Sequence, residues 1–94
     1  MDLSAHTILV VEPNVTPFTA RLQAAIEHEG ARSILVRTAA EASDRIKQSR
    51  LTAAIVSAEY RALAEQLGIQ YVLYVPSEPP STIIADLRRL LLGP

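Results

Sequence analysis

The 94-residue sequence contains no cysteine, so disulfide bonds, thiol catalysis and thiolate metal sites are excluded. It has only three glycines, Gly30, Gly68 and Gly93, and each stands directly after a predicted helix. A dinucleotide fingerprint and a phosphate-cradling loop both need glycine in a strand-to-helix turn. The sequence therefore predicts no nucleotide-binding loop, and we expect the protein to use no cofactor.

Histidines, long apolar runs and clustered basic residues are also scarce. His6 and His28 lie outside any metal-ligand spacing, so no metal site is predicted. No apolar stretch approaches the roughly 20 residues that span a bilayer, and the first seven residues lack the apolar core of a signal peptide. The net charge is −1 with scattered basic residues, which favours neither nucleic acid nor a membrane surface. We expect one cytoplasmic domain over residues 1–94.

Four short apolar runs predict strands, and a helical pattern follows each of them. Such short runs, several of them rich in β-branched residues, are typical of strands buried on both faces. The predicted strands are Thr7–Glu12, Arg32–Arg37, Ala53–Ser57 and Ile69–Val75. The strict alternation predicts an α/β fold, a three-layer sandwich with a parallel sheet and helices on both faces. In the last helix we expect five aliphatic side chains to be buried: Ile83, Ile84, Leu87, Leu90 and Leu91.

Two motifs indicate a family. "ILVVE" is followed by a helix entered at "PNVTPF", and "TAAEA" opens the second helix. With the order of the other elements, these motifs make nearly the whole chain similar to a response-regulator receiver domain of two-component signalling. The resemblance implies a flavodoxin-like sheet. The family has five strands in the order 2-1-3-4-5. Here only four are predicted, in the order 2-1-3-4, so the fourth helix and fifth strand of the family are expected to be missing.

The phosphorylation chemistry of the family maps poorly onto this chain. The resemblance places the acidic pair at Glu12-Pro13, with one carboxylate lost, and the phosphoacceptor position at Ser57. The hydroxyl that ends the fourth strand in receivers falls at position 75 or 76, which are valine and proline, with a serine at 77. Glu78-Pro79 stands where the family has Lys-Pro. The acceptor and the Lys-Pro position are therefore both expected to be degenerate.

Lysine and aspartate are too few to restore this chemistry. The only lysine is Lys47, on the second helix near the opposite end of the predicted fold. No aspartate ends a strand. A residual acidic pocket of Glu12, helped by Glu59, offers too little anionic oxygen for a hard cation. Ser57 is therefore interpreted as filling an abandoned phosphorylation position.

The leading functional hypothesis is a non-phosphorylatable pseudo-receiver without catalytic residues. It would act as a protein–protein interaction module in two-component signal transduction, and its partner would be a histidine kinase, a regulator or an output protein. Two alternatives stay open. One is a signalling switch modified at Ser57 in place of the usual aspartate, and the other is a small serine-dependent enzyme using Ser57 and Glu12.

The fourth strand also predicts a homodimer. Without a fifth strand, "QYVLYV" becomes an edge of the sheet with unpaired backbone groups. Natural edges are usually blunted by charge, proline or a bulge, and this segment has neither a charge nor a proline before Pro76. Either the last helix or a second copy must cover this edge, and we favour the second copy. We expect Tyr71, Leu73 and Tyr74 to form the dimer edge, with both tyrosines able to be exposed. The two copies would join these strands antiparallel across a two-fold axis or pack their last helices together.

Overall fold

The computed structural model describes residues 3–93, and in this range strands and helices alternate. The elements are β1 (Thr7–Val11), α1 (Pro17–His28), β2 (Arg32–Val36), α2 (Ala39–Gln48), β3 (Ala53–Ser57), a 3₁₀ turn η1 (Ala58–Tyr60), α3 (Arg61–Gln66), β4 (Tyr71–Tyr74) and α4 (Pro80–Leu92). Among the described residues, none of the helices has the length and apolar character needed to cross a membrane.

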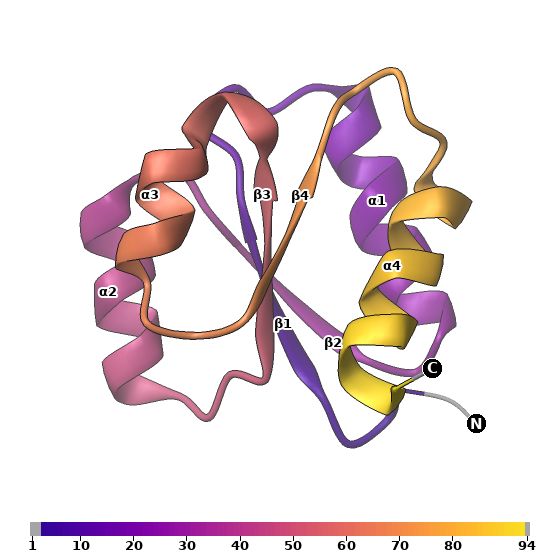
Figure 1. Ribbon diagram of the computed structural model, residues 1–94, viewed down its shortest axis with the longest axis horizontal. Helices are drawn as coiled ribbons and strands as arrows, with labels where there is room; N and C mark the ends of the chain where they lie inside the picture. Colours follow the sequence, from indigo (N-terminus) through magenta and orange to yellow (C-terminus); the bar gives the residue numbers. More distant parts are fainter. Residues whose placement is uncertain (1–2, 94) are drawn as a thin grey trace.

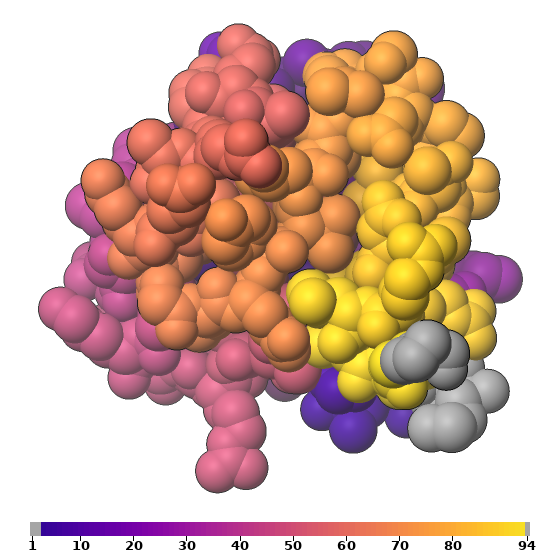
Figure 2. Space-filling model, in the orientation of Figure 1, coloured from indigo at the N-terminus to yellow at the C-terminus, as the bar shows by residue number. Residues whose placement is uncertain are grey.

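The four strands form one parallel sheet in the order β2-β1-β3-β4, which confirms the predicted fold class. Helices α1 and α4 cover one face, and α2 and α3 cover the other (Figure 1). The architecture is therefore a flavodoxin-like three-layer sandwich with two edge strands, β2 and β4. In Figure 2, which has the same orientation, the orange atoms of the segment around β4 reach the surface between α3 and α4.

Each face of the sheet has its own apolar cluster, because successive strand residues point to opposite faces. On the α1/α4 face the cluster includes Ile8, Val10, Leu22, Ile26, Ile55, Val72, Ile83 and Leu87. On the α2/α3 face it includes Leu9, Val11, Val36, Ala42, Ala54, Val56, Ala64 and Leu67. Both faces of the two central strands are therefore buried, which explains why their sequences are continuous apolar runs rather than alternating ones.

Helix starts follow local signals in the sequence. The Thr38 side chain accepts a hydrogen bond from the Glu41 backbone N–H at 3.1 Å and caps α2. At α1, the Thr16 backbone N–H donates to the Thr19 hydroxyl at 3.1 Å, and Pro17 occupies the first helical position.

One of the five aliphatic side chains expected in the core of α4 is exposed. Ile83, Ile84 and Leu87 are buried and Leu91 is partly buried, but Leu90 is 37% exposed. Leu91, in the same last turn, still packs against the core, so the turn itself does not extend beyond it. At about 100° per residue, Leu90 lies at the margin of the buried face of α4. The prediction for Leu90 is wrong.

Candidate functional site at the carboxyl end of the sheet

Three side chains predicted from the sequence meet at the carboxyl ends of β1, β3 and β4. Ser57 is in register with Tyr74 on the neighbouring strand, and Glu12 directly follows Val11, whose partner on β3 is Val56. Paired residues of a parallel sheet point to the same face, so Glu12, Ser57 and Tyr74 all lie on the α1/α4 side. All three are buried, with 6%, 1% and 1% of their surface exposed.

Glu12 uses both carboxylate oxygens within the protein. The Tyr74 hydroxyl donates a hydrogen bond to Oε2 of Glu12, across 62 residues of sequence. The Asn14 backbone N–H donates to Oε1 at 3.1 Å. Each oxygen thus accepts one hydrogen bond from the protein, and because Glu12 is almost fully buried, little of its carboxylate is open to a ligand. The Asn14 side chain amide also donates to the Tyr60 hydroxyl at 3.2 Å, which ties the β1–α1 loop to the end of η1.

Tyr74 is held as a neutral donor. Burial of the phenol, its hydrogen bond to Glu12 and the negative charges of Glu12 and Glu59 all raise the pKa of Tyr74 far above its usual range. Its ring stacks on Phe18, with centroids 5.7 Å apart and an interplanar angle of 23°. The aromatic pair therefore fixes the ring, and the ring places the hydroxyl on Glu12.

In the part of the chain that the structure describes, the other predicted site residues make no hydrogen bond to Glu12 or Tyr74. Glu59 lies in η1 and is exposed, so it acts on the pair only through its charge. Glu78 belongs to the β4–α4 turn, where its Oε1 accepts from the Val75 N–H at 3.0 Å. Pro79 is the residue that precedes α4. Within residues 3–93 there is no group of three or more His, Asp or Glu side chains arranged to hold a metal ion.

One positively charged residue at the carboxyl edge of the sheet, Arg37, was not predicted from the sequence as a site residue. The Arg37 guanidinium, at the end of β2, donates to the Pro13 carbonyl at 3.4 Å. Lys47 is far from it, since α2 runs back from the carboxyl end of the sheet and Lys47 lies in its last turn. Arg37 is exposed and its contact is with backbone, so it stabilises the β1–α1 loop.

The exposure expected for Tyr74 is wrong. Tyr71 and Tyr74 are three residues apart, and strand residues alternate with a period of two, so the two rings point to opposite faces. Tyr74 is buried against Phe18, whereas Tyr71 and Leu73 lie on the α2/α3 face and are partly exposed. Only Tyr71 and Leu73 of the expected dimer edge remain at the surface.

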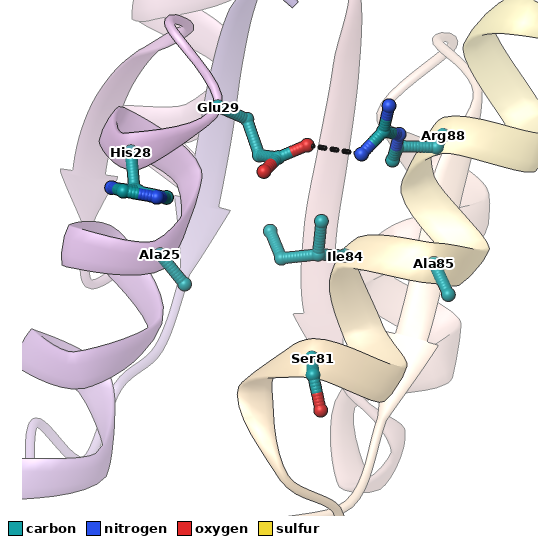
Figure 3. Close-up of a pocket in the computed structure, with 7 residues that line it drawn as sticks. All are labelled: Ala25, His28, Glu29, Ser81, Ile84, Ala85 and Arg88. Carbon is teal, nitrogen blue, oxygen red and sulfur yellow. Dashed lines mark hydrogen bonds and ion pairs between the residues drawn. The ribbon is translucent and has the colours of Figure 1, made fainter. Parts of the chain in front are cut away.

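A groove between α1 and α4 is a second candidate site, and no sequence motif indicated it. It has a volume of about 420 Å³ and is lined by Ala25, His28, Glu29, Ser81, Ile84, Ala85 and Arg88. Figure 3 shows Ile84 between the two helices and Glu29 paired with Arg88 across them, with a nitrogen–oxygen distance of 2.7 Å. The groove therefore has an apolar floor and a charged rim.

No family model matches this chain, and no curated protein matches it. The class of protein is therefore defined by its fold alone, an α/β sandwich with a four-stranded parallel sheet and a closed carboxyl-end site.

Proposed function

We propose that this chain is a non-phosphorylatable pseudo-receiver that acts as a protein–protein interaction module in two-component signal transduction. The receiver-like motifs of the sequence and the sheet order 2-1-3-4 support the first part of the proposal. The observation that carries the loss of phosphorylation is the hydrogen bond from Tyr74 to Glu12, which closes the position where a receiver holds its metal ion.

Three properties of the site argue against phosphoryl transfer. Glu12 is 6% exposed, and each of its oxygens already accepts a hydrogen bond from the protein, so a divalent cation would have to compete with these donors at a buried carboxylate. Ser57 is 1% exposed, so neither a phosphodonor nor a kinase reaches its hydroxyl in the folded state. The single lysine, Lys47, lies at the other end of the fold and supplies no charge for a transferred phosphoryl group.

In this proposal the closed carboxyl-end site has a structural role, and the partner binds to an outer surface of the protein. The α1–α4 groove has the apolar floor that a partner side chain needs, and the ion pair of Glu29 with Arg88 adds polar groups of both signs at its rim. The partner belongs to a two-component pathway, as a histidine kinase, a regulator or an output protein.

The phosphorylation half of the proposal is tested by incubation with acetyl phosphate and Mg²⁺. The intact mass of the protein is expected to stay unchanged, because the metal site is closed and the acceptor aspartate is replaced. An increase of about 80 Da, the mass of one phosphoryl group, mapped to Ser57, would contradict it. A receiver with an intact acidic pair and lysine is the positive control.

The interaction half is tested by measuring binding to a panel of purified two-component proteins from the same organism. At least one is expected to bind, with the same affinity whether or not acetyl phosphate is present. The substitution Ala85→Glu places a charge in the groove and is expected to weaken binding about tenfold or more. Ala40→Glu, at an exposed position of α2, is the matched control and should bind normally. If no member of the panel binds below about 100 μM, the interaction role is wrong.

A further inference from the structure

The free edge of β4 exposes a short, regular set of backbone groups. Among residues 3–93, strand β4 pairs with β3 alone, and the Gln70 carbonyl accepts from the Ala54 N–H at 3.0 Å. Because N–H and C=O groups alternate sides along a strand, residues 70, 72 and 74 face β3. The N–H and C=O of Tyr71 and of Leu73 therefore point away from the sheet, and no other residue among 3–93 provides them with a hydrogen-bond partner.

The end of this edge is closed by a side chain. Val75 continues the outward-facing set, but its N–H donates to Oε1 of Glu78 at 3.0 Å. Pro76 follows and has no N–H to offer. Within β4 the available groups are thus those of Tyr71 and Leu73, and a register that pairs these two residues with each other uses all of them.

The opposite edge of the sheet is different. In β2 the Arg32 N–H and the Val36 carbonyl bond to β1, so Ser33 and Leu35 face outward. This strand begins with Arg32 and is followed by Arg37, and two-fold pairing of β2 would bring those arginines close to each other across the interface. From Ile69 to Ser77 the β4 segment carries no charged residue, so nothing of this kind opposes its pairing.

We infer that β4 is the surface through which two copies of this chain associate. A two-fold axis perpendicular to the sheet, passing between the two strands midway between their Val72 residues, places Tyr71 opposite Leu73 of the second copy and Leu73 opposite its Tyr71. Each of these pairs exchanges two N–H···O=C bonds, so the four outward groups of each copy are all satisfied. The two four-stranded sheets become one continuous sheet in which β4 is antiparallel to its counterpart.

Side chains extend this contact on the α2/α3 face. Tyr71 and Leu73 are partly exposed there, and opposite residues of such a pair have Cα atoms about 5.5 Å apart, so each Tyr71 packs against Leu73 of the second copy. Val75, 40% exposed, adds apolar surface at the end of the strand. A contact of this size is smaller than a standard interface, so the association is expected to depend on concentration in the micromolar range. It does not depend on the proposed signalling role.

The test compares the two edge strands with matched proline substitutions. Leu73→Pro removes an outward N–H of β4, and Leu35→Pro removes an outward N–H of β2, while both leave the internal ladder intact. In sedimentation velocity from about 1 to about 500 μM, the unsubstituted chain and Leu35→Pro are expected to change from monomer to dimer. Leu73→Pro is expected to stay monomeric throughout.

A second variant and a residue-specific readout guard against a folding defect in Leu73→Pro. Tyr71→Lys keeps the backbone and adds a charge next to the axis, and it is expected to raise the dimer dissociation constant about tenfold or more. Amide exchange of Tyr71 and Leu73 should slow as the concentration rises, whereas that of Ser33 and Leu35 should not. A monomer over the whole range would overturn the proposal, even if the edge then bound a peptide from another protein. A dimer that both β4 variants leave unchanged, or open-ended oligomers, would also overturn it.

Discussion

Replacing Tyr74 by phenylalanine isolates the hydroxyl that closes the carboxyl-end site. The ring and its stacking on Phe18 are kept, and only the hydrogen bond to the Glu12 carboxylate is lost. Glu12 is 94% buried, so water cannot easily replace the lost donor, and the Asn14 N–H alone remains on the carboxylate. A hydrogen bond to a charged group contributes about 1.5–3 kcal/mol, and we expect the free energy of unfolding to fall by that amount.

Urea denaturation followed by circular dichroism measures this loss. For a domain of this size a loss of about 2 kcal/mol lowers the urea midpoint by about 1–2 M. Tyr71→Phe is the control, because its hydroxyl has no hydrogen bond within residues 3–93, and it should change stability by less than about 0.5 kcal/mol. In a double-mutant cycle with Glu12→Ala, which removes the acceptor, the two substitutions should be coupled by at least about 1 kcal/mol. Equal effects of the two tyrosine substitutions, or no coupling, would refute the closure of the site by Tyr74.

Four further outcomes follow from the structure. Burial and the hydrogen bond to Glu12 raise the pKa of Tyr74, so the folded state keeps a proton that the unfolded chain releases above about pH 10. The contribution of Tyr74 to the free energy of unfolding should therefore be constant below that pH and fall above it, and Tyr74→Phe should remove that part of the decline in urea titrations. Ser57→Ala should change the unfolding free energy by less than about 1 kcal/mol, since the small side chain fills space at the end of β3; a larger loss would indicate a polar role. Leu87→Ala should cost about 2–5 kcal/mol and Leu92→Ala less than about 0.5 kcal/mol in the same assay, because Leu87 is fully buried and Leu92 is 36% exposed. Thr38→Ala should cost about 1 kcal/mol through the lost cap of α2, and an unchanged thermal midpoint would contradict the cap.

The roles of Glu78 and the α1–α4 groove illustrate what a resemblance leaves out. Glu78 occupies the position at which the receiver family has the lysine of Lys-Pro. Its carboxylate accepts a hydrogen bond from the Val75 N–H, and this closes the end of the free edge of β4. Its side chain thus belongs to the turn that leads into α4 rather than to a phosphate site. The groove came from the packing of α1 against α4, and small residues such as Ala25 and Ala85 gave no periodic signal of it.

The sequence by itself determined the elements and the sheet. Each strand is a short apolar run, and most helices carry a local signal at one end, such as a capping threonine, a proline in the first turn or a following glycine. Short connections between strands and helices then require parallel strands with crossovers of one hand. Glu12 and Ser57 were also predictable as neighbours, because residues that end parallel strands meet at one edge.

Only the tertiary structure decided what those residues do. The bond between Tyr74 and Glu12 joins residues 62 positions apart, and it depends on the register of three strands and on the support of the ring by Phe18. The apolar run "YVLYV" shows no alternation from which to assign its tyrosines to a face, so the burial of Tyr74 and the exposure of Tyr71 could not be separated. Leu90 is exposed for a similar reason, since the elements packed against α4 decide how far round the helix burial extends. Local residue preferences fix which segments form, whereas burial and hydrogen bonding depend on what the rest of the chain places next to them.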